Sequence, residues 1–294
     1  MTLPKFPDYA LKTMGVYSSV VGRLSSMNVP PPVLTPFLKM YSRWFHVNMD
    51  DLPRPLREYS SFKDFFTRQL KNGQRIINPR IDTIVAPVDG TILEAGSADS
   101  PVANTFRIKS RYYMIEELLG KMAYYDFHCE DMTGVYMNFY LDPGAYHRIH
   151  APMSGDISLR SFSPGTLFPV NRIGRKLNPD YHIKNSRVTI KLSSPDGKVH
   201  IFMVLIGALG VGNIILTYNG TQDFSPRDKG TFEMIDPPIS VEKGQEIGIF
   251  NMGSSVFMLC YCSKDEKMAI TAQTGRIQMG SSVIESPVLG PGTQ

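Results

Sequence analysis

Cysteine is scarce in this chain of 294 residues, which has only Cys129, Cys260 and Cys262. So small and odd a number does not make a disulfide framework, and we expect a reducing compartment or unpaired thiols. Cys260 and Cys262 are two residues apart in an apolar run, where a strand would place both on one face. We interpret them as a buried reduced pair, with a metal-binding pair as the alternative.

Long hydrophobic runs are also missing. The longest, Ile201 to Leu216, is shorter than the roughly 20 residues of a membrane-spanning helix and contains several glycines. We interpret it as two buried strands joined at the glycines, whose spacing does not match the GxGxxG of a dinucleotide-binding loop. Proline and charged residues interrupt the first apolar residues, so we expect no signal peptide.

Acidic residues are few at one end of the chain. Residues 1–75 contain 11 Lys and Arg against 5 Asp and Glu, a net charge of +6, so the remainder has 20 basic and 22 acidic residues, or −2. The basic excess therefore belongs to the N-terminal quarter and suggests a polyanionic partner there. No recognised nucleic-acid-binding motif accompanies it, so we expect no nucleic acid partner.

Two amphipathic helices are predicted in this basic end. Apolar side chains recur at every third or fourth position in residues 9–27, and again in residues 33–45 after three prolines. The second stripe includes the single tryptophan, Trp44, beside Lys39 and Arg43. Such a pattern is typical of a helix in a membrane interface, and packing on the protein's own core is the alternative. A further helix is predicted from the N-cap residue Ser61 to Leu70.

The chain from about residue 81 onward is predicted to be rich in sheet. Short β-branched runs between Gly and Pro turns indicate strands, at residues 84–86, 91–93, 135–141, 188–192, 199–206, 214–218, 247–250 and 256–261. A helix is expected at residues 116–122. We therefore predict an α+β fold: an N-terminal helical membrane-associating region of residues 1–76 and a β-sheet-rich catalytic core of residues 77–294.

Four residues could carry chemistry. Asp89 lies among apolar neighbours, where a carboxylate must find a partner that compensates for its lost hydration. His147 and His150 would share one side of a helical turn, and zinc is an alternative although no further ligand follows at a suitable spacing. Ser254 follows a glycine near the C-terminus. An Asp, a His and a Ser together are the components of a nucleophile activated by an oriented imidazole.

Four segments resemble, in order and approximate spacing, those of the phosphatidylserine decarboxylase proenzyme family. They are PVDG at 87–90, YHRIH at 146–150, PGTLFPVN at 164–171 and FNMGSSV at 250–256, and the similarity covers nearly the whole chain. The third segment looks like a loop that enters a strand and could line a pocket.

The family's processing site is commonly Leu-Gly-Ser-Thr, whereas Met252 and Ser255 occupy the outer positions here. Gly253 and Ser254 are retained. Cutting at the second Gly-Ser-Ser, residues 280–282, would leave a tail of only 14 residues, so we place the cut before Ser254.

The resemblance implies that the chain cuts itself between Gly253 and Ser254, into a β chain of residues 1–253 and an α chain of residues 254–294 that stay associated. His150, oriented by Asp89, would remove the proton of the Ser254 hydroxyl, which attacks the Gly253 carbonyl. Ser254 would then become a pyruvoyl group and the Schiff-base site for the substrate amine, with no metal or pyridoxal phosphate required.

The resemblance further implies a substrate, a product and a location. Phosphatidylserine of anionic membranes would be converted to phosphatidylethanolamine and CO2, with His147 as the proton donor and Phe168, Val170 and Asn171 binding substrate. We expect a homodimer of processed protomers, peripheral to the cytoplasmic face of the cell membrane. The alternatives are a related decarboxylase for a soluble amino acid and a non-catalytic lipid-binding module.

Overall fold

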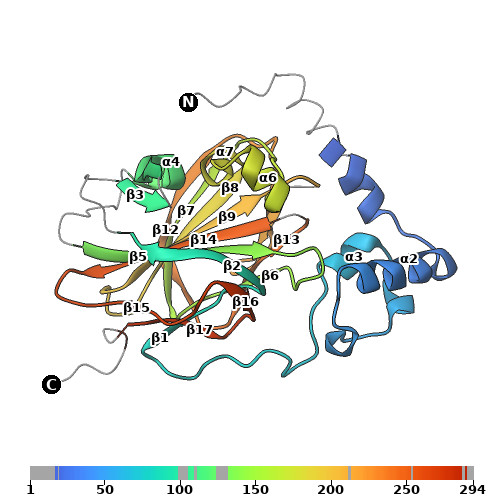
Figure 1. Ribbon diagram of the computed structural model, residues 1–294, viewed down its shortest axis with the longest axis horizontal. Helices are drawn as coiled ribbons and strands as arrows, with labels where there is room; N and C mark the ends of the chain where they lie inside the picture. The colour runs from blue at the N-terminus through green and yellow to red at the C-terminus, as the bar shows by residue number, and fades with distance from the viewer. Residues whose placement is uncertain are drawn as a thin grey trace.

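A computed structural model describes residues 17–18, 20–98, 105–108, 111–123, 132–210, 213–252, 254–286 and 289. Helices gather at the N-terminal end and antiparallel sheets make up most of the rest (Figure 1). The predicted α+β architecture, with a sheet-rich core and N-terminal amphipathic helices, is confirmed. No helix in the described part of the chain combines the length and the apolar composition needed to cross a membrane.

The N-terminal helices begin where local chemistry favours them. Residues 17–18 and 20–26 are helical, and the rest of the predicted helix at 9–27 lies outside the described residues. Helix α2 (Pro31–Trp44) has proline in its first turn, where no amide hydrogen is needed. Helix α3 (Phe62–Phe66) begins where the Ser61 side chain accepts a hydrogen bond from Asp64 N, as predicted, but ends before Leu70. The 3-10 turns η1 (Met49–Asp51) and η2 (Leu56–Glu58) lie between α2 and α3.

Helix α2 has two apolar faces. Its inner face packs in a cluster whose buried members all come from residues 34–65: Leu34, Leu38, Val47, Leu52, Leu56, Tyr59 and Phe65. Its outer face leaves Val33, Phe37, Met40 and Trp44 from 42% to 73% exposed. The single predicted stripe therefore divides into a part that packs on the protein and a part that meets solvent.

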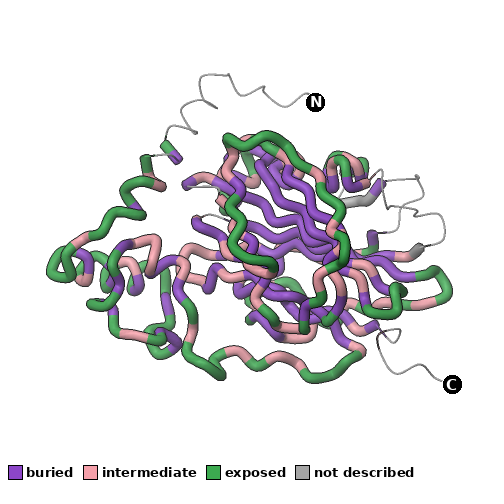
Figure 2. Tube along the Cα trace, turned by 180° about the vertical axis from the view of Figure 1, so that it is seen from behind, coloured by how far each residue is buried: buried purple, intermediate pink, exposed green. Residues whose placement is uncertain are grey.

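An eight-stranded antiparallel sheet forms the centre of the molecule, in the order β12-β7-β8-β9-β14-β5-β2-β16. Its strands are β2 (Gly90–Ser97), β5 (Met132–Leu141), β7 (Gly155–Ser163), β8 (Arg187–Ser193), β9 (His200–Gly207), β12 (Thr231–Val241), β14 (Ser254–Ser263) and β16 (Gly275–Ile277). Strand β14 lies between β9 and β5, and Figure 2 shows the middle of the sheet as buried.

Smaller sheets and short helices cover the two faces of the central sheet. One face shares the main core with two sheets: β11 (Gln222–Phe224), β10 (Ile214–Leu216), β13 (Glu246–Phe250) and β6 (Arg148–His150); and β1 (Thr83–Val85), β17 (Ser282–Glu285) and β15 (Ala269–Ile270). The other face packs on α4 (Ile115–Leu119), η3 (Gly120–Met122) and α7 (Tyr181–Lys184). Helix α6 (Arg172–Leu177) and the pair β3 (Thr105–Ile108) and β4 (Arg111–Met114) complete the described elements.

Each predicted strand overlaps an observed one, and the run from Ile201 to Leu216 divides into β9 and β10 as predicted. Cys260 and Cys262 are buried in the same core cluster, which agrees with the expected buried pair. Cys129 lies outside the described residues.

Candidate active site

Ser254 opens strand β14, where it pairs with Leu141 of β5 and Gly207 of β9. The residue is fully buried, and its Oγ has no hydrogen-bond partner among the residues that the structure describes. A buried hydroxyl without a partner costs about 1–3 kcal/mol, so it calls for an explanation, and a catalytic role is one. Gly253 lies outside the described residues, so the bond predicted to be cut is described on its serine side alone.

The two histidines lie at a strand, and the prediction of a shared helical turn is wrong. Residues 148–150 form β6 because they pair with β13, and His147 lies directly before that strand. His147 O accepts a hydrogen bond of 2.9 Å from Phe250 N, at the end of β13 that leads to Ser254. His150 is opposite Glu246, at the other end of β13.

Both imidazoles have the same tautomer. His147 Nδ1 is 2.9 Å from Ala145 O, and His150 Nδ1 is 2.7 Å from Gly244 O. Because a carbonyl oxygen only accepts, Nδ1 carries the hydrogen and Nε2 presents a lone pair in each ring. His150 Nε2 accepts from the Tyr146 hydroxyl at 3.1 Å. The buried Nε2 of His147 has no partner within the described residues.

The pKa values of both histidines are low. Burial lowers the pKa of His147 to about 3; the hydrogen bond to Ala145 O opposes this effect and the charge of Arg68 adds to it. Burial also lowers the pKa of His150, against the opposing effects of Gly244 O and of the carboxylates of Glu246 and Asp89. His147 is therefore neutral near pH 7, and it must gain a proton before it can donate one.

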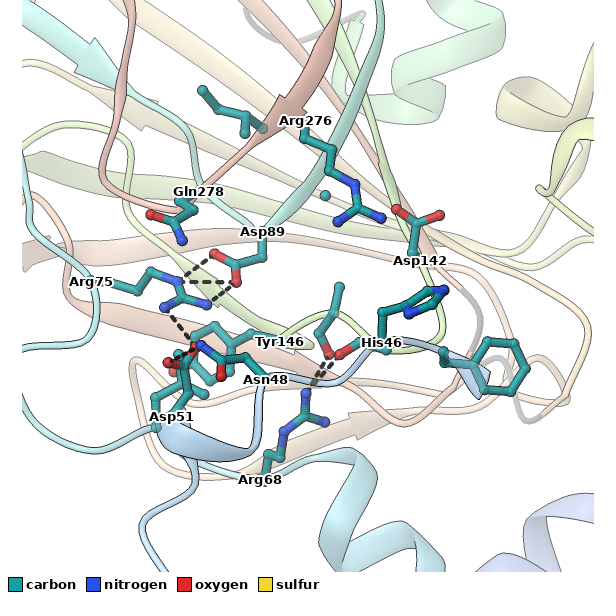
Figure 3. A pocket seen from close by; sticks show the side chains of 16 residues that line it. His46, Asn48, Asp51, Arg68, Arg75, Asp89, Asp142, Tyr146, Arg276 and Gln278 are labelled. Carbon is teal, nitrogen blue, oxygen red and sulfur yellow. Dashed lines mark hydrogen bonds and ion pairs between the residues drawn. The ribbon is translucent and has the colours of Figure 1, made fainter. Parts of the chain in front are cut away.

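The Asp89 carboxylate forms an ion pair with the Arg75 guanidinium (Figure 3). Arg75 Nε lies 2.9 and 3.0 Å from the two carboxylate oxygens and Nη2 lies 2.5 Å from Oδ2. Met279 N also donates to Asp89, and Arg75 Nη1 contacts Asp51 at 3.1 Å. Burial lowers the pKa of Arg75, but its hydrogen bonds to Asp89 and Asp51 raise it more, so the net shift is upward.

The three members of the predicted relay are not joined by hydrogen bonds among the described residues. Asp89 bonds to Arg75 and His150 bonds to Tyr146, as given above. Asp89 and His150 are nevertheless close in the fold, because His150 N donates to Pro87 O at 2.9 Å. The structure thus brings Asp89 near His150, and His147 near the strand that leads to Ser254.

A first cavity of about 300 Å³ lies beside Asp89, where the N-terminal region meets the core (Figure 3). Its charged lining is balanced, with three acidic and three basic residues: Asp51, Asp89, Asp142, Arg68, Arg75 and Arg276. Arg68 also donates to Gly144 O at 2.8 Å, two residues before the histidine segment at residues 146–150. The N-terminal region therefore contributes directly to the surroundings of Asp89 and His147.

The loop at 164–171 leads out of β7 into helix α6, so the prediction that it enters a strand is wrong. It ends in a helix because the exposed Asn171 caps α6, accepting a hydrogen bond from Gly174 N at 2.9 Å. Phe168 and Val170 are buried.

Asn185, which the sequence does not single out, connects this loop to the serine strand. Its Nδ2 donates to Phe168 O at 2.9 Å and to Gly207 O at 2.8 Å, and its Oδ1 accepts from Phe168 N at 3.1 Å. Gly207 is the residue paired with Ser254. Asn185 thereby holds Phe168 in a fixed relation to the start of β14.

Comparisons with known proteins agree on one family. Residues 62–285 match the family model described as phosphatidylserine decarboxylase. The phosphatidylserine decarboxylase proenzyme of Psychrobacter arcticus is 32% identical over 273 residues, covering 92% of this chain and 94% of that protein. Proenzymes of the same name from Brevibacillus brevis and Marinobacter nauticus are each 33% identical, over 76% and 82% of this chain and 80% and 83% of their own.

Proposed function

Because the chain belongs to the phosphatidylserine decarboxylase family, we propose that it converts phosphatidylserine to phosphatidylethanolamine and CO2 after cutting itself between Gly253 and Ser254. The observation that carries this proposal is the Ser254 hydroxyl, which is buried at the start of the central strand and has no partner among the described residues. Such a hydroxyl loses no existing hydrogen bond when it turns to attack.

Self-cleavage starts at Ser254 Oγ, which attacks the carbonyl carbon of Gly253. A base takes the hydroxyl proton and returns it to the backbone nitrogen as the amide becomes an ester. Elimination across Cα and Cβ of residue 254 releases the Gly253 carboxylate and leaves dehydroalanine. Water converts the dehydroalanine to a pyruvoyl group and ammonia.

His150, oriented by Asp89, is the base that the resemblance to the family assigns. Its Nε2 would have to exchange the Tyr146 hydroxyl for Ser254 Oγ. His147 is a second candidate because its buried Nε2 is an acceptor without a donor, whereas Ser254 Oγ is a donor without an acceptor within the described residues. Single His150→Ala and His147→Ala variants separate the two, since the chain that stays uncut lacks the base.

A pyruvoyl group at position 254 supplies the electron sink that accepts the electrons released with CO2. The surroundings fit such a group, because Ser254 is buried and its side chain forms no hydrogen bond that the conversion would break. Neutral His147 can take a proton from the substrate ammonium and return it to the carbon that lost CO2, which is the role proposed for it. Phe168, Val170 and Asn171 are proposed to bind substrate, and Asn171 also shapes that loop by capping α6.

The two fragments are proposed to stay associated. Strand β14 pairs with β5 along all ten of its residues and with β9 along eight of them, from Ser254 to Tyr261. A cut before Ser254 leaves these ladders intact, so residues 254–294 remain held in the central sheet. The homodimer and the domain division at residue 76 stay predictions.

Peripheral binding to a membrane is proposed for the outer face of α2. This face exposes Val33, Phe37, Met40 and Trp44 beside the exposed residues Lys39 and Arg43. Apolar and aromatic side chains flanked by cations suit the interface of an anionic bilayer. Location at the cytoplasmic face of the cell membrane stays a prediction.

The proposed reaction can be tested with purified protein and two substrates. Phosphatidylserine vesicles should yield phosphatidylethanolamine and CO2, whereas the Ser254→Ala variant should yield neither. Decarboxylation of free serine with no action on the lipid would favour the soluble amino acid alternative. An uncut protein that sediments with vesicles but releases no CO2 would be a lipid-binding module.

A further inference from the structure

A second cavity, of about 380 Å³, is lined by the N-terminal helical segment at residues 20–26 and by Asn251, which lies shortly before Ser254. Three basic residues from three different segments line it: Arg23, Lys63 and Arg227. No acidic residue is among its described lining residues, in contrast to the first cavity with its balanced charges. A concave site with charge of one sign concentrates ligands of the opposite sign, so this cavity favours an anion.

Two lining residues, Asn251 and Leu167, place the cavity near Ser254. Asn251 lines it and precedes Ser254 by three residues, with its backbone N donating to Asn213 O at 3.1 Å. Leu167 also lines it and is followed by Phe168. Asn185 donates hydrogen bonds to Phe168 O and to Gly207 O, and Gly207 pairs with Ser254. A ligand bound here would thus lie against the segment that carries the reactive residue.

Asn251 provides an independent sign of a ligand. It is only 2% exposed, and its Oδ1 is buried without a partner in the part of the chain that the structure describes. A buried amide oxygen is normally satisfied by an N–H or O–H donor. A ligand that brings an ammonium group to the serine side of the cavity would supply that donor.

We propose that Arg23, Lys63 and Arg227 bind the phosphodiester of the phosphatidylserine headgroup and that Asn251 accepts a hydrogen bond from its ammonium group. This inference rests on the proposed function, because it assigns the headgroup of that substrate to a site. Two exposed apolar side chains, Val20 and Leu24, lie on the same helical segment as Arg23, and exposed Met27 follows directly after it. The cavity therefore lies beside a surface at which the acyl chains could stay in the bilayer while the headgroup enters.

The first test measures binding without catalysis. Glycerophosphoserine is titrated by calorimetry into the uncut Ser254→Ala protein and into the same protein carrying Lys63→Gln or Arg227→Gln. Each lost cation should weaken binding by about tenfold, because a hydrogen bond to a charged group contributes more than a neutral one. Lys198→Gln and Lys267→Gln, exposed lysines of the core that do not line this cavity, are matched controls and should bind like the parent.

The second test uses the processed enzyme and a short-chain phosphatidylserine that dissolves as monomers, so that membrane binding plays no part. Lys63→Gln and Arg227→Gln should raise KM by about tenfold and leave kcat and the extent of self-cleavage unchanged. Equal affinity and equal KM in the variants and controls would overturn the headgroup site. A parent enzyme that binds glycerophosphoserine through these cations but never decarboxylates would instead contradict the proposed function and leave the site in place.

Discussion

Ser254 and Ser255 are neighbours of the same type in opposite surroundings. Alternation along β14 sends their side chains to opposite faces of the central sheet. Ser255 Oγ donates to Phe139 O at 2.7 Å and contacts Asn138 at 3.0 Å, whereas Ser254 Oγ has no partner among the described residues. The strand thus gives one serine a structural role and leaves the other available for reaction.

Arg75 is predicted to stabilise the fold through Asp89. Both side chains are about 10% exposed, so an Arg75→Met substitution leaves a nearly buried carboxylate without its cation. Breaking such a pair costs about 3 kcal/mol of unfolding free energy. Denaturant titration of the uncut Ser254→Ala protein with and without Arg75→Met measures the loss.

A matched control for Arg75 is Arg80, which pairs with Asp82 and Glu285 at the surface. Water solvates these groups in the folded and the unfolded chain alike, so Arg80→Met should change stability far less. Similar losses in the two variants would show that Asp89 does not depend on Arg75.

The stability of the uncut protein is predicted to fall as the pH is lowered, because of His147. Its pKa is about 3 in the folded state against an ordinary 6.5, so below pH 6.5 the unfolded chain binds a proton that the folded chain does not. Stability is therefore greatest above pH 6.5 and falls as the pH drops towards 3, by up to about 1.4 kcal/mol per pH unit for this group. Unfolding at a series of pH values in the Ser254→Ala background gives the slope.

Replacing His147 by Phe should reduce this slope, although His150 and His200, whose pKa values are also lowered, leave part of it. Phe66→Leu is the control, because the ring of Phe66 packs 4.0 Å from that of His147 without titrating. This control should lower stability but keep a pH slope, because His147 is still present to titrate. An unchanged slope in His147→Phe would mean that the imidazole has the same pKa in the folded and the unfolded chain.

Residue types and motif order identify Asp89, His147, His150 and Ser254 as candidates from the sequence. Arg75, Asn185 and Asn251 are not identifiable in this way, because each acquires its role from a contact with a distant segment. Arg75 illustrates the limit: the need of Asp89 for a partner can be predicted, but 31 Lys and Arg are available to meet it. The fold decides which one does.

At the level of elements, α2 shows what periodicity can and cannot predict. The spacing of its apolar residues predicts the helix, but the pattern alone does not distinguish the side that packs inward from the side that stays open. The histidine segment shows a second limit, since pairing with β13 makes it a strand although its spacing also suits a helical turn. Short elements depend on their neighbours more than on their own sequence.

The outer face of α2 is predicted to bind membranes. Met40 and Trp44 are 54% and 73% exposed, so replacing both with Ser should leave the inner cluster intact. Loss of this apolar area should weaken binding to phosphatidylserine vesicles by at least about tenfold. Sedimentation with vesicles measures the change.

Met234→Ser is the control for the vesicle experiment, because Met234 is 66% exposed on β12, outside the N-terminal region. It should sediment like the parent protein. Full vesicle binding by the α2 double variant would mean that this face has another purpose. Substitution is preferable to deleting residues 1–50, which would remove part of the cluster formed by residues 34–65.

At the scale of the whole molecule, the N-terminal region forms hydrogen bonds with residues 143–148, around the two histidines. The Tyr41 hydroxyl donates to Pro143 O at 2.7 Å, and Arg148 Nε donates to Thr67 O at 3.0 Å. Together with Arg75 and Asp89, these bonds connect the proposed membrane-binding helices to the proposed catalytic residues. A sheet-rich core with N-terminal helices is predictable from composition and periodicity, whereas this docking depends on contacts between distant residues.

The central claim is that the chain cuts itself before Ser254, and an intact-mass spectrum of the purified protein tests it most directly. We predict two polypeptides, residues 1–253 and residues 254–294, the shorter one lighter than its sequence by the mass of one ammonia. The Ser254→Ala variant should give a single chain of 294 residues, and Ser281→Ala should be cut like the parent. A single uncut chain from the parent protein, or a fragment that begins at Ser281, would contradict the claim.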